Sequence, residues 1–157
     1  MGKIPADAAE RELLHELQAD SKRGLRELSR KLGLPISTVH EKIKRLERDG
    51  YIKGYHAILD EKKLGFAVTG FILVSVNYTA APKTTQAEIA AKAAKLPNVQ
   101  EVHIITGEWD FLVKAKAESV EELGKMVTGK LRTIPGVEKT LSIITYETVK
   151  EEAGLDL

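Results

Sequence analysis

Residues 25–50 read LRELSRKLGLPISTVHEKIKRLERDG, and this stretch decides the fold of the N-terminal part of the chain. It contains two stripes of apolar residues at helical spacing, separated by a short turn with a glycine and a proline. The stripes consist of Leu25, Leu28 and Leu32, and then of Val39, Ile43 and Leu46. Gly33 is expected to end the first helix, and the second is expected to begin near Ser37 or Thr38. Two short helices joined by a turn that contains glycine are typical of a helix-turn-helix.

The face of the second helix opposite its apolar stripe is polar and basic. A recognition helix needs this combination, because one side packs on a partner helix while the other enters the major groove of DNA. Residues near the start of the helix can reach base edges, whereas basic residues meet phosphates, which set affinity and register. The candidates for base edges are Ser37, Thr38, His40 and Glu41. The candidates for phosphates are Arg26, Arg30, Lys44, Arg45 and Arg48. A solvated basic face on a small helical domain is the alternative interpretation.

The charge of the chain is concentrated around these two helices. The 157 residues together have a formal net charge of only +1. Residues 21–55 carry ten basic and four acidic side chains, a net charge of +6, whereas residues 1–20 and 56–157 have net charges of −3 and −2. A basic segment flanked by acidic ones favours a polyanion-binding module joined to another unit.

The segments on either side complete an N-terminal domain and a hinge. Asp7 and Glu10 form a capping-box pattern, and leucines follow at helical spacing, which predicts a third helix in front of the pair. Residues 1–50 are therefore expected to form a three-helix, winged-helix-like domain. Residues 51–59 are rich in β-forming side chains and precede a polar turn, so we place a β-rich hinge at 51–68.

The remainder of the chain contains an internal repeat. Leu96-Pro-Asn-Val99 recurs 38 residues later as Ile134-Pro-Gly-Val137, each time between an expected helix and an expected strand. The expected strands are 71–78, 99–106, 111–117 and 137–147, and the two helices open at Thr85 and Ser119. This order is β-α-β-β-α-β, which predicts an α+β chain with a ferredoxin-like domain over 69–148 and a tail over 149–157.

Two expected strands of this domain are apolar on both faces. They are Phe71-Ile-Leu-Val74 and Val102-His-Ile-Ile105. Two helices can cover only one face of a four-stranded sheet, so the other face is expected to meet another subunit. The sequence therefore predicts an oligomer.

The link Gly107-Glu-Trp-Asp-Phe111 is the second candidate site. It places an aromatic ring and two carboxylates at a strand end, where Asp110 or Glu108 could pair with the ammonium group of an amino acid. Gly107 would let a ligand approach the backbone. An ordinary hairpin turn with a packed Trp109 is the alternative interpretation.

Several classes of protein are excluded by absent features. Without cysteine there is no disulfide, thiolate metal site or cysteine nucleophile, which fits a cytoplasmic location. The four histidines are scattered, and His15-Glu16 and His40-Glu41 both lack the second histidine of the zinc-protease motif. No catalytic residue, metal or cofactor is therefore expected. No stretch approaches the ~18 apolar residues of a membrane helix, and no signal peptide is expected.

Taken together, these residues resemble the Lrp/AsnC (leucine-responsive, or feast/famine) transcriptional regulators. The resemblance is carried by residues 28–55, LSRKLGLPISTVHEKIKRLERDGYIKGY, and continues through Leu64-Gly65 to Thr106-Gly-Glu-Trp-Asp-Phe111. It covers about residues 7–148. The chain departs from the family pattern at Trp109, where Tyr is common, and at Pro35, where a serine often precedes the recognition helix.

The resemblance implies double-stranded DNA as one partner and a small effector, usually an amino acid, as the other. It also implies a homodimer with sheets packed back to back, which assembles to a tetramer or octamer. Effectors would bind between dimers, near the residues that match the family's link: Thr106, Gly107, Glu108, Trp109 and Asp110.

Three hypotheses remain at this point. The first is a sequence-specific regulator whose assembly and DNA affinity respond to an amino acid. The second is an architectural DNA-wrapping protein without effector control. The third is a metabolic amino-acid-binding module or enzyme whose basic helices only dock a protein partner.

Overall fold

The computed structural model describes residues 7–77, 79, 84–152 and 154–155, and it divides the chain into two compact units. One unit runs to Ile58 and also includes the segment from Lys150 onward, while the other spans Leu59–Val149. The division at Ile58 lies within the 51–68 segment that we placed as a hinge. The last residues, which we expected to be a separate tail, are grouped with the first unit.

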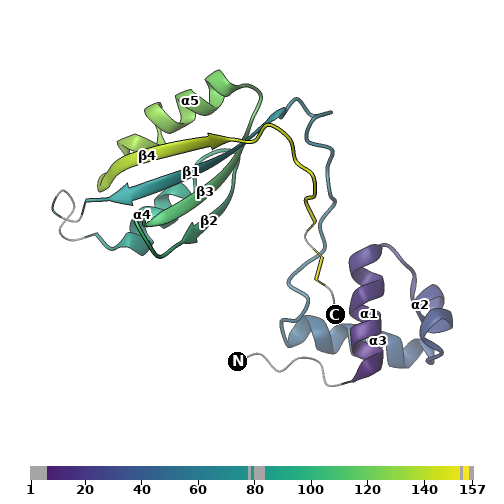
Figure 1. Cartoon of the computed structure of the whole chain (residues 1–157). Coiled ribbons are helices and arrows are strands. Elements are labelled where there is room, and N and C mark those ends of the chain that lie inside the picture. The colour runs from purple at the N-terminus through teal and green to yellow at the C-terminus, as the bar shows by residue number, and fades with distance from the viewer. Residues whose placement is uncertain (1–6, 78, 80–83, 153, 156–157) are drawn as a thin grey trace. The chain divides into compact units, whose positions relative to one another are not determined.

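The first unit is built from three helices, α1 (Ala8–Ala19), α2 (Leu25–Leu32) and α3 (Ile36–Arg48) (Figure 1). Their apolar stripes meet in one core, whose fully or nearly fully buried members are Leu13, Leu17, Leu28, Val39 and Leu46. Gly33 has a φ of 64°, the left-handed conformation that ends α2, so the expected helix-turn-helix is confirmed.

The start of α3 differs from the sequence-based expectation. The helix begins at Ile36, one residue before the expected Ser37, and no side chain that the structure describes caps it. Ser37 and Thr38 both lie inside the first turn of the helix. Pro35 stands at the N-cap position with a φ of −56°, and its carbonyl accepts a hydrogen bond from Val39 N at 3.0 Å. Proline suits this place because its fixed φ is already close to that of a helix.

The second unit is a four-stranded antiparallel sheet with helices on one face. Its elements are β1 (Val68–Val76), α4 (Gln86–Ala93), β2 (Val99–Ile104), β3 (Phe111–Ala117), α5 (Val120–Gly129), a short 3-10 helix η1 (Leu131–Thr133) and β4 (Val137–Ile144). The strand order is β2-β3-β1-β4. This is the ferredoxin-like arrangement, so the chain is α+β, as the sequence predicted.

Some strand bounds were wrong. Strand β1 begins three residues before the expected Phe71, while β2 ends at Ile104 and β4 at Ile144, before their expected ends at 106 and 147. The expected end of the first strand, Tyr78, lies outside the described residues. Residues 52–60 are all described, and none of them is in a strand. Their β-rich composition therefore forms no ladder within a single chain.

Helices α4 and α5 cover one face of the sheet and leave the other open (Figure 1). Side chains that alternate along the central strands, among them Ile72, Val74 and Val113, are fully buried under the helices. The opposite face carries a second row of apolar side chains, which cross-strand pairing places side by side: Phe71, Leu73, Leu112, Leu141 and Ile143. Leu141 and Ile143 are each 48% exposed. We call these five residues the open face.

Gly70 on β1 lies directly against Leu123 of α5. A Cβ atom added at this position would lie 2.5 Å from Leu123 Cδ2, closer than two carbon atoms can pack. The residue is buried, and Leu123 is only 2% exposed. The absence of a side chain at Gly70 therefore leaves the space that Leu123 occupies.

Candidate nucleic-acid interface and ligand site

Helix α3 has a buried side and an exposed polar side. Val39 and Leu46 are buried against the other two helices, and Ile43 is partly buried beside them. On the other side Ser37, Glu41 and Lys44 are exposed, whereas the base-edge candidates Thr38 and His40 are partly buried. The structure thus brings the candidate base-reading residues together over the first turns of α3. Since no described side chain caps α3, its first backbone N–H groups are also left without a side-chain acceptor.

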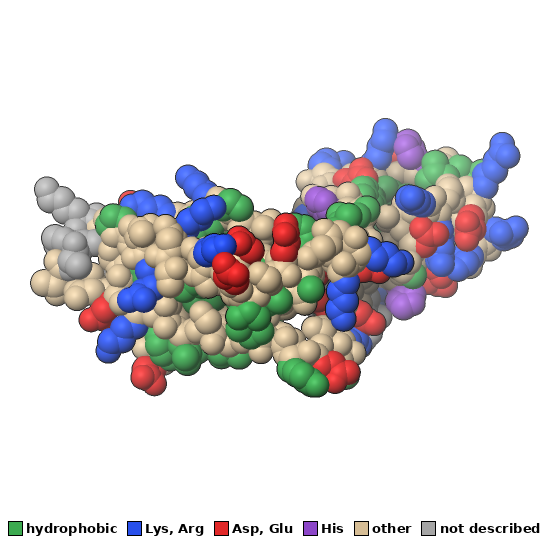
Figure 2. Space-filling view, turned by 90° about the horizontal axis from the view of Figure 1, so that it is seen from above, with side chains coloured by type: hydrophobic (Ala, Val, Ile, Leu, Met, Phe, Trp, Pro, Cys, Tyr) green, Lys and Arg blue, Asp and Glu red, His purple; other side chains and the backbone are tan. Residues whose placement is uncertain are grey.

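The phosphate candidates fall into two groups by their partners. Arg26, Arg30 and Lys44 are exposed, and none of them forms an ion pair with a described residue. Arg48 contacts Asp49, with 3.1 Å between Nε and Oδ1, but its side chain is still 73% exposed. Figure 2 shows Lys and Arg side chains, in blue, that project from the surface of the helical unit. These four residues are therefore accessible to a polyanion.

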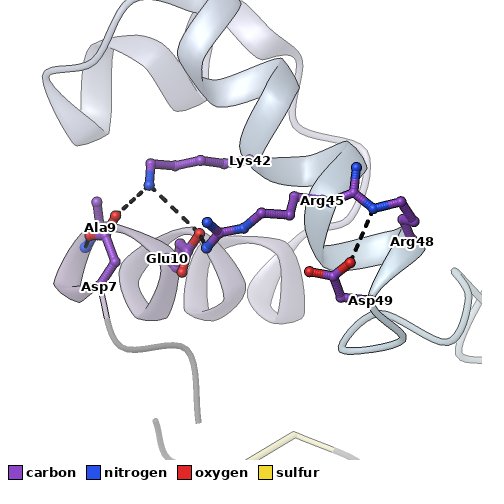
Figure 3. A network of polar contacts seen from close by, with 7 residues as sticks. All are labelled: Asp7, Ala9, Glu10, Lys42, Arg45, Arg48 and Asp49. Carbon is purple, nitrogen blue, oxygen red and sulfur yellow. Dashed lines mark hydrogen bonds and ion pairs between the residues drawn. The ribbon is translucent and has the colours of Figure 1, made fainter. Parts of the chain in front are cut away.

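Arg45 is different, because it is paired with a buried carboxylate. Its Nη2 contacts Oε1 of Glu10, which lies on α1 and is only 1% exposed (Figure 3). Lys42 Nζ lies 3.6 Å from the same oxygen and also bonds to Asp7. The Lys42 hydrogen bond, followed by that from Ala9 N, lowers the pKa of Asp7. Polar contacts thus join the start of α1 to α3. We call the four residues that make them the α1–α3 network: Asp7, Glu10, Lys42 and Arg45.

Sequence reasoning missed the role of Glu10, which it assigned to a capping box. Asp7 does cap α1, because its side chain accepts from Ala9 N at 2.8 Å. Glu10 instead points toward α3. The signal was present in the sequence, since Glu10 precedes Leu13 and Leu17 by three and seven residues and so shares their buried face. A carboxylate on an apolar stripe indicates a buried ion pair.

The chain that leaves α3 is fastened to the helix that it follows. Ile52 N donates to Leu46 O at 3.1 Å, and the Tyr55 hydroxyl donates to Glu47 Oε1 at 2.9 Å. Burial and this hydrogen bond raise the pKa of Tyr55 to about 12, so the phenol remains a donor at neutral pH. Two hydrogen bonds thus hold residues 52–55 against the end of α3.

The link between β2 and β3 is an exposed turn that ends on a partnered carboxylate. Gly107 has a φ of 122°, a conformation that residues with a side chain rarely adopt. Thr106, Gly107 and Glu108 are exposed, while Trp109 and Asp110 are partly buried. The first three candidates, and part of Trp109, are therefore open to a ligand.

Asp110 holds three segments of the sheet unit together. Its backbone N donates to Val74 O at 2.9 Å, and its Oδ2 accepts from Val76 N at 2.7 Å. Gln86, at the start of α4, donates through Nε2 to the Asp110 carbonyl oxygen at 2.8 Å and to Oδ1 at 3.2 Å. Strand β3 pairs with β1 only as far as Val74, so the Asp110 carboxylate accepts the N–H group that lies beyond the ladder. Gln86 is a functional candidate that the sequence analysis did not contain.

Among the described residues, no group of three or more His, Cys, Asp or Glu side chains could hold a metal ion. Over the same residues, no helix has both the length and the apolar character needed to cross a membrane.

Both units match known protein families. Residues 7–53 match the family model of the winged helix-turn-helix DNA-binding domain, and residues 69–155 match that of the Lrp/AsnC ligand binding domain. An uncharacterized HTH-type transcriptional regulator of Pyrococcus abyssi is 44% identical over 146 residues, which cover 93% of this chain and 96% of that protein. The leucine-responsive regulatory protein of Escherichia coli is 32% identical and covers 95% of this chain, with 90% of its own length matched.

A solved structure has the same fold over nearly the whole chain. It is a transcriptional regulator of Neisseria meningitidis in complex with L-Met, with a TM-score of 0.86 and 26% sequence identity. The match covers 96% of each chain.

Proposed function

This chain belongs to the Lrp/AsnC family, and we propose that it recognises a specific duplex sequence under the control of an amino-acid effector. Membership of this family makes it a transcriptional regulator with a DNA-binding and a ligand-binding domain, and not an enzyme. The exposed polar side of α3 is the observation that carries the DNA part of this proposal. Its opposite side is locked into the core by Val39 and Leu46, so the helix is presented as a rigid element.

The residues of this interface have two tasks. Ser37, Thr38, His40 and Glu41 read base edges from the first turns of α3. Arg26, Arg30, Lys44 and Arg48 bind phosphates and set affinity and register. The sequence placed Arg45 in the second group, but its pairing with Glu10 supports another role, which is developed below.

A second copy of the chain covers the open face. Exposed apolar side chains in one continuous row lose contact with water when they pack on another such row, and this row is made of large residues. A two-fold pair of sheets buries it on both subunits. Such a dimer also presents two recognition helices, which suits a pseudo-palindromic operator. Larger assemblies, such as a tetramer or an octamer, are built from these dimers.

The effector binds between dimers at the exposed link. Gly107 leaves the backbone accessible, and Thr106, Glu108 and Trp109 offer a hydroxyl, a carboxylate and an aromatic ring. Support for an amino acid comes from the relatives, because one is named leucine-responsive and another was solved with L-Met. Asp110 contributes by shaping the link, since its own carboxylate is already bonded to Val76 and Gln86.

Effector and DNA are coupled through assembly. An amino acid between dimers changes how many helix-turn-helix pairs are joined in one particle, and hence how many adjacent half-sites can be bound at once. The coupling is reciprocal, so DNA must change the amino-acid affinity by the same factor.

Fluorescence anisotropy tests the proposal directly. The duplex is taken from upstream of the chain's own gene, a shuffled duplex is the control, and both are titrated with and without a mixture of the twenty amino acids. We expect preference for the native duplex and a shift in affinity with the mixture. Tight binding to both duplexes without any shift would instead support an architectural DNA-wrapping protein. Failure to bind either duplex at low salt would refute the DNA-binding proposal.

A further inference from the structure

Helix α3 carries two basic side chains that are paired with the carboxylates of Asp7 and Glu10. Lys42 has 18% of its side chain exposed and lies against Asp7 and Glu10. Arg45 is about half exposed, but its guanidinium contacts Glu10 (Figure 3). Their neighbour Lys44 is exposed and has no ion pair with a described residue. Charge on α3 is therefore divided between groups available to DNA and groups engaged with α1.

We propose that Glu10 is a positioning residue for DNA recognition, which holds α3 against α1 through Arg45 and Lys42 and withholds these two charges from the DNA backbone. The inference rests on the proposed function. It differs from a mere stabilising ion pair, because it assigns Glu10 an influence on how strongly the protein binds DNA of any sequence.

Burial explains why one carboxylate can hold two cations. Glu10 is 1% exposed, and its Oε2 has no hydrogen-bond partner among the described residues. All of its pairing therefore runs through Oε1. In surroundings poor in water the attraction between opposite charges is screened less than at the surface, so both side chains stay directed at this atom. The resulting contact adds a polar link between α1 and α3 to their apolar packing.

The expected benefit to the protein is discrimination. Contacts between basic side chains and phosphates raise affinity for all sequences alike and do not separate the operator from other DNA. Two further phosphate contacts on α3 would thus add mainly non-specific binding. By engaging Arg45 and Lys42, Glu10 lowers that background while the exposed residues of α3 read the bases.

The first test compares Arg45→Gln with Lys44→Gln. Both remove one positive charge from adjacent positions of α3. Binding to the native and shuffled duplexes is measured over a range of salt concentrations, and the slope of log K against log [salt] is determined. A lost phosphate contact reduces this slope by about 0.9. We expect that reduction for Lys44→Gln and an unchanged slope for Arg45→Gln. An equal reduction for both variants would show that Arg45 binds phosphate and would overturn the proposal.

The second test releases the two charges. Glu10→Gln is compared with Glu16→Gln, which removes the same charge from the same helix but whose partners, Arg23 and Lys31, are not on α3. We expect Glu10→Gln to bind the shuffled duplex more tightly, with a slope steeper by up to about 1.8, the value for two added phosphate contacts. In the Arg45→Gln background the increase should fall to about half. An equally steep slope in Glu16→Gln would indicate a general charge effect and would overturn the proposal.

The outcomes distinguish three cases: failure of the proposed DNA-binding function, a purely stabilising role of Glu10, and the positioning role that we propose. If the unmodified protein does not prefer the native duplex, the proposed function fails first. If Glu10 only stabilises the fold, Glu10→Gln lowers binding to both duplexes with the slope unchanged. Circular dichroism establishes whether each variant is folded. Should Glu10→Gln not fold, an equal reduction of the slope in Arg45→Gln and Lys44→Gln would still overturn the proposal.

Discussion

Replacement of Asp110 separates a positioning role at the link from direct binding of the effector. The carboxylate accepts hydrogen bonds from Val76 N at 2.7 Å and from Gln86 Nε2 at 3.2 Å. Asp110→Ala removes both, whereas Asp110→Asn keeps one oxygen that can accept from Val76. Asp110→Ala removes the charge and the acceptor together, whereas Asp110→Asn removes only the charge. The two variants are therefore compared.

The magnitude follows from these contacts. A hydrogen bond to a charged group contributes about 1.5–3 kcal/mol to stability, with the lower values at partly exposed sites such as this one. Gln86 keeps its second bond, to the Asp110 carbonyl oxygen, so the loss falls mainly on Val76. We expect Asp110→Ala to lower the free energy of unfolding by about 1.5–2 kcal/mol. For a chain of this length that corresponds to a fall in Tm of about 3–8 °C. Asp110→Asn should lose about 1 kcal/mol or less.

Urea denaturation at fixed protein concentration measures these changes. Trp109 is the single tryptophan of the chain and adjoins Asp110, so its fluorescence reports on the sheet unit. The same variants are then tested for their DNA affinity with and without the amino-acid mixture. We expect Asp110→Ala to lose the effector response while it retains DNA binding, and Asp110→Asn to keep both.

Two results would refute this reasoning. Wild-type stability in Asp110→Ala would show that the carboxylate does not hold the link to β1. A complete loss of effector response in Asp110→Asn, at unchanged stability, would show that Asp110 pairs with the effector's ammonium group directly.

Four further predictions concern other parts of the molecule. Gly70→Ala should cost about 1–3 kcal/mol by overpacking against Leu123, and Leu123→Val in the same chain should recover part of it; an unchanged urea midpoint would contradict the packing argument. Ser37→Ala should change sequence preference by about 1–3 kcal/mol at one base pair without altering the salt slope, as measured by anisotropy on single-substitution duplexes. Leu112→Arg should dissociate the dimer, and a wild-type sedimentation coefficient at equal concentration would exclude the open face as the interface. The lowered pKa of Asp7 stabilises the fold above the carboxyl's ordinary pKa, and this contribution is lost as pH falls through the lower folded value. Asp7→Asn should therefore be less stable than wild type at about pH 7, and the difference should shrink as the pH is lowered below the carboxyl's ordinary pKa, as measured by urea denaturation across pH.

Much of the fold could be predicted because it depends on local patterns. The stripe of leucines before Gly33 and the cap at Thr85, which forms a full capping box with Glu88, are both decided by residues a few positions apart. Strand β3 was predicted with its correct bounds, because the lysines at 114 and 116 alternate with the apolar residues Val113, Ala115 and Ala117. Such signals need no knowledge of the rest of the chain.

Other features could not be predicted, because they depend on residues far apart in the sequence. Glu10 and Arg45 are separated by 35 positions, and a capping-box rule competed for Glu10. Gln86 and Val76 reach Asp110 only after the sheet has formed. For residues 52–60 the sequence favoured a strand that the structure does not contain. The residue types of this segment suit a strand, but a ladder also requires a neighbouring backbone, and one chain alone does not provide it.

The return of the C-terminal segment to the helical unit has a practical consequence for protein engineering. The side-chain amide of Gln18 on α1 donates to Leu155 O at 3.1 Å and accepts from Leu155 N at 2.7 Å, so the helical unit is completed by the last part of the chain. The unit is therefore discontinuous in sequence, and an exchange of DNA-binding modules between two such regulators has two junctions instead of one. A chimera that takes α1 from one parent should take its final residues from that parent as well. A fusion partner attached directly after Leu155 would lie beside α1, although in the sequence this segment follows the sheet unit.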